Sequence, residues 1–364
     1  VTMMKQPTIT RRAFALSSIA FTGLTLTSIA TVSAAEQPIP KPDGKPADMT
    51  KPVQVFLIMG QSNAVGLGKL PSLEAAVKNK GKYSYLVDDT GAWMDRKDVR
   101  HVQMMSGKLM VNDWMNVKNR GGFVGLEYGI GHVVGNTIDA PVMILKSCIG
   151  NRSLGWDLLP PGSERFVEGD KVYAGYKDRP DSWPVDPAKG KATEPPPWLG
   201  KDGKPVQWWA GLQYDSDVAD AKKVLAELAT YYPDATKYEV AGIFFWQGEK
   251  DGGNPVHAAH YEQNLVNFIK SVRKDFNAPN AKFVLATMGE AVKDSGNKVM
   301  EGQLAVDGTS GKYPEFKGNV ATVYTNPMAQ GGSGNGHYGG KAEVYMDVGE
   351  AMGKAMTELL KTKP

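Results

Sequence analysis

Residues 53–63 read VQVFLIMGQSN, and this stretch decides the fold. Its first seven residues form a short, nearly continuous apolar run, which is typical of a strand that a parallel sheet buries on both faces. Four later runs have the same character: 141–146 (PVMILK), 240–246 (VAGIFFW), 282–287 (KFVLAT) and 319–324 (NVATVY). Apolar residues recur with a helical period of about 3.6 in three segments: 215–232, 257–276 and 342–360. Strands that alternate with helices predict a three-layer α/β/α sandwich around a parallel sheet.

Two long segments do not follow this alternation and are expected to be loop insertions. Residues 67–123 are polar and spaced by glycine, whereas residues 155–212 are dense in proline, glycine and tryptophan. A loop of that length within a compact domain usually serves a function. The aromatic rings of the second insertion could stack on sugar rings, or they could simply fix a long loop to the domain.

The first 35 residues have the composition of an export signal. Three basic residues and no acidic residue precede an uncharged stretch that runs from Ala13 to Ala35 and ends in small residues, as in a cleavable signal peptide. The pair Arg11-Arg12 resembles a twin-arginine signal; an uncleaved membrane anchor is the alternative. Residues 36–52 are rich in Pro and Lys and are expected to form a linker, so the main domain would span 53–364.

Charge and cysteine content narrow the possible partners. The chain has 42 Lys and Arg against 39 Asp and Glu, and three of the basic residues lie in the expected signal. The remaining chain is therefore formally neutral, which favours neither nucleic acid nor an anionic membrane as a partner. Cys148 is the single cysteine, so neither an intramolecular disulfide nor a cysteine-based metal site can form.

Polar residues directly follow the predicted strands, where ligands bind in an open parallel sheet. The first strand leads into Gly60-Gln61-Ser62-Asn63, where Ser62 could be a nucleophile or could merely cap a helix. The strand at 240–246 leads into Gln247-Gly248-Glu249-Lys250-Asp251. There an amide could donate to an oxyanion and a carboxylate could orient a histidine, although acidic residues also stabilise a helix N-terminus through its dipole.

One histidine stands out near the C-terminus. His337 lies in a glycine-rich loop just before the last predicted helix, and histidine is the usual general base for a serine nucleophile. His257 and His260 would suit a surface or a weak metal pair equally well, and His101 and His132 are expected to be structural. After the second strand, Gly150 could present its backbone N–H to an oxyanion or could form a simple turn.

These residues resemble a known family. The segments VFLIMGQSNAVG and WQGE and the late histidine are similar to the sialate O-acetylesterase-like branch of the SGNH hydrolases, which includes the sixth carbohydrate esterase family. The resemblance runs from about Val53 to Leu360 and implies a flavodoxin-like fold.

The resemblance also implies roles for individual residues. Ser62 would be the nucleophile and His337 the general base, while the oxyanion hole would consist of the backbone N–H groups of Ser62 and Gly150 and the side chain of Gln247. Many members place an aspartate three residues before the histidine, and here that position is Gly334. Substrate contacts are expected from neighbouring residues: Gln61, Asn63, Asn151, Arg152 and Trp156.

The catalytic carboxylate must therefore come from another segment. Relatives that use the acid of a Gln-Gly-Glu segment point to Glu249, with Asp251 as the reserve candidate. The resemblance implies an exported, periplasmic or extracellular bacterial enzyme that removes O-acetyl groups from carbohydrate through an acyl-enzyme, without metal or cofactor. An esterase for other esters and a non-catalytic carbohydrate-binding protein are the alternatives; the absence of an acid at Gly334 favours the second of these. The glycan and the oligomeric state stay open.

Overall fold

The computed structural model describes residues 38–188, 194–329 and 337–362. The expected export signal and Gly334 lie outside these residues. Residues 39–364 form one compact unit. In the described part of the chain, no helix is both long enough and apolar enough to cross a membrane.

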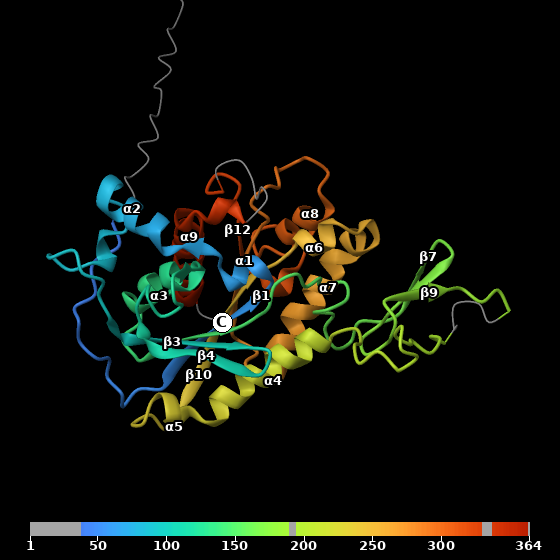
Figure 1. The fold of residues 1–364 in the computed structure, drawn as a ribbon, viewed down its shortest axis with the longest axis horizontal. Helices are drawn as coiled ribbons and strands as arrows, with labels where there is room; N and C mark the ends of the chain where they lie inside the picture. The colour runs from blue at the N-terminus through green and yellow to red at the C-terminus, as the bar shows by residue number, and fades with distance from the viewer. Residues whose placement is uncertain (1–37, 189–193, 330–336, 363–364) are drawn as a thin grey trace, which may run out of the picture. The chain divides into compact units, whose positions relative to one another are not determined.

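A seven-stranded sheet forms the centre of this unit, in the order β12-β11-β10-β1-β6-β3-β4 (Figure 1). Its strands are β1 (Val53–Gly60), β3 (Arg96–Met105), β4 (Lys108–Met115), β6 (Val142–Ser147), β10 (Tyr238–Trp246), β11 (Lys282–Ala286) and β12 (Val320–Val323). All neighbouring pairs are parallel except β3 and β4. The expected parallel sheet is confirmed, and without β3 and β4 the strand order is that of flavodoxin-like folds.

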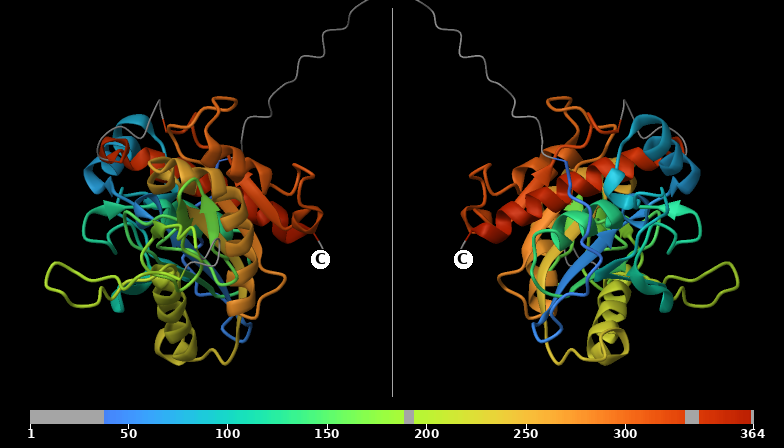
Figure 2. Two further views of the ribbon diagram at one scale, coloured as in Figure 1. Left: turned by 90° about the vertical axis from the view of Figure 1, so that its right-hand side faces the viewer. Right: turned by 90° about the vertical axis from the view of Figure 1, so that its left-hand side faces the viewer.

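Helices cover both faces of the sheet. They are α1 (Ser62–Val65), α2 (Leu70–Lys80), α3 (Leu126–Gly135), α4 (Leu212–Ala226), α5 (Leu228–Tyr231), α6 (Glu249–Gly252), α7 (Pro255–Asp275), α8 (Lys298–Ala305) and α9 (Ala342–Lys361). Short 3₁₀ turns occur at η1 (Ser84–Leu86), η2 (Pro314–Phe316) and η3 (Tyr338–Gly340). Figure 2 shows α9 and α7 from two opposite sides.

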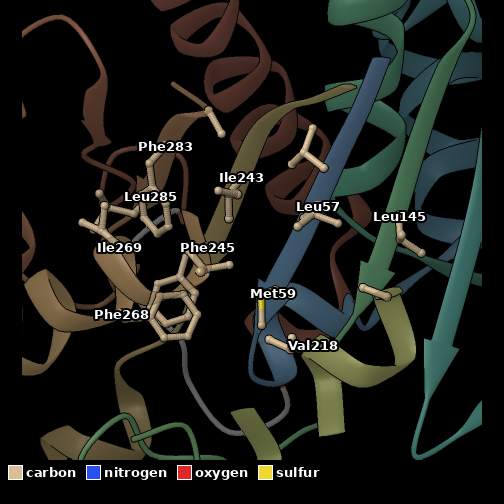
Figure 3. Packing of buried hydrophobic residues seen from close by; sticks show 14 of the residues in the cluster. Leu57, Met59, Leu145, Val218, Ile243, Phe245, Phe268, Ile269, Phe283 and Leu285 are labelled. Carbon is tan, nitrogen blue, oxygen red and sulfur yellow. The ribbon is translucent and has the colours of Figure 1, made fainter. Parts of the chain in front are cut away.

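The alternation of β1 side chains divides the core into two layers. Leu57 and Met59 belong to one buried cluster, with residues of α4 and α7 (Figure 3). Phe56 and Ile58 point to the opposite face and belong to a second cluster, with residues of α3 and α9. This pattern of a strand that is buried on both faces is what its continuous apolar sequence predicts.

The expectation that residues 67–123 form a loop insertion is wrong for its central part. Residues 96–115 form β3 and β4, and β3 pairs in parallel with β6 inside the main sheet. Their sequence, with Arg, Lys, His, Gln and Asp between the apolar positions, lacks the continuous apolar run of a central strand. Arg96, the first residue of β3, is buried and pairs with Asp98 and with the side chain of Asn136.

The second insertion is also structured. It contains a three-stranded antiparallel sheet of β7 (Phe166–Glu168), β8 (Lys171–Tyr173) and β9 (Ser182–Pro184). Its first and last residues meet, because the backbone N–H of Gly211 donates to the carbonyl of Trp156 at 2.8 Å. Trp183 is buried in a small apolar cluster that is separate from the two core clusters of the main sheet.

A minor two-stranded sheet joins β2 (Gly68–Lys69) to β5 (Phe123–Val124). Residues 38–52 have no helix or strand.

The end of β1 depends on a glycine. Gly60 has a φ of +137°, and a Cβ at this position would overlap the backbone carbonyl oxygen of Trp246 at the end of β10. The next residue, Gln61, donates its backbone N–H to that same carbonyl at 3.2 Å. Glycine thus lets two neighbouring strands end in direct backbone contact.

We expect Gly60→Ala to lower the free energy of unfolding by about 3 kcal/mol, because overpacking (roughly 1–3 kcal/mol) adds to the cost of a positive φ (roughly 1 kcal/mol). Urea unfolding followed by circular dichroism measures the loss. Gly81→Ala is the matched control, since Gly81 also has a positive φ but has open space around it. Equal losses in the two variants would show that the contact with Trp246 is unimportant.

Candidate active site

Ser62 begins α1 directly beyond the carboxyl end of β1. It is partly exposed and lines a cavity of about 1030 Å³. The N-cap position of α1 belongs to Gln61, and no side chain caps this helix. Ser62 therefore does not serve as a helix cap, and it is one of the residues that line the cavity.

His337 lines the same cavity, although it comes from the other end of the chain. It is half-buried and has a positive φ of 54°, and its neighbour Tyr338 fixes its place. The Tyr338 ring stacks on Trp246, with ring centroids 5.9 Å apart, and its hydroxyl accepts a hydrogen bond from the Asn63 amide at 3.0 Å. The residue after the serine thus contacts the residue after the histidine.

Glu249 lies at the start of α6 and also lines the cavity. The Asn63 amide donates a hydrogen bond to its Oε1, while its Oε2 is buried and has no partner among the described residues. Desolvation, reinforced by the nearby charge of Glu290, raises the pKa of Glu249 to about 8. This carboxyl group therefore has one oxygen free to pair with a cation.

Asp251, the reserve candidate, is fully buried and has other partners. One of its oxygens accepts the backbone N–H of Leu154 and the other accepts that of Gly155, both at 2.8 Å. It also accepts a hydrogen bond from the Gln247 amide. Both carboxylate oxygens of Asp251 thus hold the loop after β6 in place.

Gln247 is fully buried, and its geometry differs from the expectation that it donates to an oxyanion. Its Nε2 donates to Gln61, to the carbonyl of Arg152 and to Asp251, and its Oε1 accepts from Tyr261 at 2.9 Å. The amide hydrogens are therefore already used in bonds between the loops that follow β1, β6 and β10. In this arrangement Gln247 supports the cavity wall and does not line it.

The loop after β6 brings Gly150 close to Ser62. A Cβ built on Gly150 would lie 3.5 Å from the Cβ of Ser62. Among the described residues, the backbone N–H groups of Ser62 and Gly150 have no protein acceptor, so both can donate to an oxyanion. Gln61, Asn63, Asn151 and Trp156 line the cavity.

The side chain of Arg152 does not line the cavity. Its guanidinium lies over the ring of Trp208, 4.9 Å from the centroid, and donates to Gln213 at 3.1 Å. It is absent from the residues that line the cavity. The expected substrate contact of Arg152 therefore has no support in its geometry, since its charge anchors the second insertion instead.

A buried ionic network of Lys146, Arg120 and Glu127 contacts the C-terminal end of α1. The sequence analysis did not predict this network. Lys146, from β6, donates to the carbonyl of Val65 at 2.9 Å and pairs with Glu127 at 2.5 Å. Arg120 donates to the carbonyl of Gly66 at 2.9 Å and pairs with Glu127 at 3.3 Å. Two cations thus bind carbonyls at the C-terminal end of the helix that begins with Ser62, where cations are favourable.

The charges of this network stabilise each other. Burial alone would raise the pKa of Glu127, but Lys146 and Arg120 hold it at about 2. Burial lowers the pKa of Lys146 to about 8, although Glu127 opposes that shift. The one signal in the sequence was a charged residue, Lys146, at the end of an otherwise apolar strand.

His101, His132 and Cys148 have structural positions. His101 and His132 are buried, and burial lowers the pKa of His101 to about 3. Burial also raises the pKa of Cys148 to about 12, which disfavours a reactive thiolate. Over the described residues, no group of three or more His, Cys, Asp or Glu side chains is arranged to hold a metal ion.

Comparison with known proteins gives a match to a family of carbohydrate esterases. Residues 200–358 match the family model of a carbohydrate esterase, the sialic acid-specific acetylesterase. This match includes Gln247, Glu249 and His337 and confirms the resemblance seen in the sequence. This part of the chain is similar to the sialic acid-specific acetylesterases, a family of carbohydrate esterases. A comparison with curated protein sequences gives no match.

Three solved structures are similar to this chain at low sequence identity. A protein from Arabidopsis thaliana is 17% identical, with a TM-score of 0.47, and the alignment covers 84% of this chain and 98% of that one. A carbohydrate acetylesterase from Xanthomonas citri is 14% identical, with a TM-score of 0.44 and coverage of 83% and 55%. NanS is 13% identical, with a TM-score of 0.42 and coverage of 77% and 79%.

We expect Glu127→Gln to lower the free energy of unfolding by about 3–5 kcal/mol, because it leaves the Lys146 ammonium buried without its counter-charge. Urea unfolding measures the loss. The double variant Glu127→Gln/Lys146→Met should recover part of it, since the uncompensated ammonium is then removed. Additive losses in the double variant would contradict the pairing.

The raised pKa of Glu249 predicts a dependence of stability on pH. Between about pH 4.5 and 8 the folded protein retains a proton that the unfolded chain releases, so stability falls as the pH rises through this range. Glu249→Gln should remove this loss and unfold at a higher temperature than the wild type at pH 8, but not at pH 4.5. In the comparison variant Glu290→Gln, the decline should end at a lower pH, because a neighbouring negative charge is gone. A wild-type stability that does not fall between pH 5 and 8 would refute the shift.

Proposed function

We propose that this protein is a serine esterase that removes O-acetyl groups from carbohydrate through an acyl-enzyme. The observation that carries the proposal is that Ser62 and His337, 275 residues apart in the sequence, line one cavity at the carboxyl edge of the sheet. Within the described ranges, the backbone N–H groups of Ser62 and Gly150 have no protein acceptor and can stabilise negative charge. The family match supplies the substrate class, acetylated carbohydrate.

In the proposed reaction, His337 takes the proton of the Ser62 hydroxyl as Oγ attacks the acetyl carbonyl carbon. The backbone N–H groups of Ser62 and Gly150 stabilise the oxyanion of the tetrahedral intermediate. The sugar oxygen leaves with the proton from His337, and an acetyl-serine remains. Water then attacks this ester with His337 as base, which releases acetate and restores the serine hydroxyl.

Glu249 is the proposed acid of the triad. Its buried Oε2 has no partner in the part of the chain that the structure describes, and Asn63 binds its other oxygen beside Tyr338, the neighbour of His337. The pKa of about 8 belongs to a carboxyl group without a nearby cation. When His337 gains a proton, the opposite charge lowers the pKa of Glu249 and favours the ion pair. Asp251 is less suited, because backbone N–H groups already occupy both of its oxygens.

Cellular location is a separate part of the proposal. The basic and then uncharged sequence of residues 1–35 favours export, which would place the enzyme where extracellular or periplasmic glycans are found.

We expect Ser62→Ala and His337→Ala each to lower kcat by about 10⁴-fold or more while the thermal unfolding temperature changes little. Acetate release from a panel of acetylated glycans and hydrolysis of p-nitrophenyl acetate measure the loss. Glu249→Gln should lower kcat strongly as well, and Asp251→Asn serves as the comparison for the choice of acid. Full activity in Ser62→Ala would refute the mechanism.

Two further measurements separate the alternatives. A p-nitrophenyl ester series from acetate to decanoate should show a preference for acetate; a preference for long chains would favour an esterase for other substrates. A fluorophosphonate probe should label the wild type and not Ser62→Ala. Glycan binding without labelling of the wild type would favour a non-catalytic carbohydrate-binding protein.

A further inference from the structure

The cavity extends from the catalytic residues to the second insertion. Ser62 and His337 line one part of it, and Asp181 and Trp198, which belong to the 155–212 segment, line another. Its volume of about 1030 Å³ lies at the upper end of the range of roughly 300–1,000 Å³ that is typical of small-molecule sites. It therefore has room for more than an acetyl group and the sugar ring that carries it.

Two partly exposed tryptophans form part of this wall. The rings of Trp156 and Trp198 pack edge to face, with centroids 6.0 Å apart and planes at 66°, and both rings line the cavity. Each holds the other in one orientation, so their aromatic surface is fixed before a ligand binds. The C–H face of a pyranose ring is apolar and packs well on such a surface.

A carboxylate lies along the same wall. Asp181 Oδ1 is 3.2 Å from His257 Nε2, while the Asp181 side chain is 40% exposed and the His257 side chain only 8%. Oδ2 of Asp181 accepts no hydrogen bond from the described residues. This oxygen can accept hydrogen bonds from sugar hydroxyls, whereas a second carboxylate at this place would be repelled.

The base of the insertion is rigidly attached to the catalytic edge. Asp251 holds the backbone N–H groups of Leu154 and Gly155, immediately before Trp156. Trp156 in turn accepts the backbone N–H of Gly211, where the insertion ends. A Cβ on Gly155 would overlap the His257 ring, so this glycine lets the loop lie directly against α7. In Figure 1 the β7–β9 sheet extends beyond α7 from this base.

We propose that Trp156, Trp198 and Asp181 form a second sugar subsite, so that the substrate is an O-acetylated oligosaccharide or polysaccharide and not an acetylated monosaccharide. A neutral sugar next to the acetylated one packs its C–H face on the two indoles and donates a hydroxyl to Asp181. This inference rests on the proposed esterase function for its catalytic part.

The direct test compares monosaccharides with tetramers of the same sugar, each chemically O-acetylated: glucose with cellotetraose, xylose with xylotetraose and galactose with β-1,4-galactotetraose. For at least one pair, the wild-type kcat/KM should be tenfold or more higher on the tetramer. Trp198→Ala and Asp181→Ala should each remove most of this preference by raising KM, while kcat/KM on p-nitrophenyl acetate stays within about twofold. Equal kcat/KM on both members of every pair, or equal losses on tetramer and p-nitrophenyl acetate, would overturn the subsite.

The matched control is Trp209→Ala. Trp209 belongs to the same insertion and donates to Asp215, but it is absent from the residues that line the cavity. The tetramer preference should survive in this variant if it folds like the wild type by circular dichroism. Loss of the preference in Trp209→Ala, with folding unchanged, would count against a role specific to Trp156 and Trp198.

A binding measurement separates this inference from the proposed catalysis. Calorimetric titration of Ser62→Ala with the same tetramers, without acetyl groups, should detect binding that the added Trp198→Ala substitution weakens tenfold or more. This result does not depend on hydrolysis, so it can hold even if Ser62 proves not to be the nucleophile. Binding that Trp198→Ala leaves unchanged would overturn the subsite whatever the activity of the enzyme.

Discussion

The close approach of β1 and β10 at their carboxyl ends is the constraint on which the site depends. Gly60 permits the backbone of β1 to contact the carbonyl of Trp246, so the two following loops begin side by side. One of these loops carries Ser62 and the other carries Glu249. Because both strands are fixed in the sheet, the separation of these two loops is set by backbone packing.

Polar groups that never face the cavity maintain this arrangement. Gln247 and Asp251 connect the loops after β1, β6 and β10, while Lys146, Arg120 and Glu127 bind the far end of α1. Each is buried with partners for its charge or amide, which is the condition under which such groups are tolerated in a protein interior. The helix that carries Ser62 is only one turn long, and hydrogen bonds at both of its ends hold it.

Sequence patterns were informative where burial is continuous. The five apolar runs are strands of the main sheet, and the helical periods at 257–276 and 342–360 correspond to α7 and α9 within two residues. Ser62 and His337 share a cavity, as the resemblance implied. The strand β3 was missed because its buried positions include Arg96, His101 and Gln103, which pair with polar groups or pack within the fold and give no apolar signal.

Side-chain roles were harder to predict than positions. A glutamine and two carboxylates after β10 suggested catalysis, yet motif spacing cannot show which hydrogen bonds each group makes in the fold. Asp251 accepts backbone N–H groups from a loop almost a hundred residues earlier in the sequence, and Arg152 lies on a tryptophan more than fifty residues later. Such partners are brought together only by tertiary structure, so the sequence around each residue does not predict them.

The hydrogen bond between Gly211 and Trp156 closes the 155–212 insertion at its base. Its entry and exit lie one hydrogen bond apart, so the chain leaves the domain and returns to it at one place. The proposed catalytic groups, Ser62, Glu249 and His337, all come from outside this segment. A change in the outer part of this closed loop, which contributes Asp181 and Trp198 to the cavity wall, can therefore alter that wall without altering Ser62 or His337.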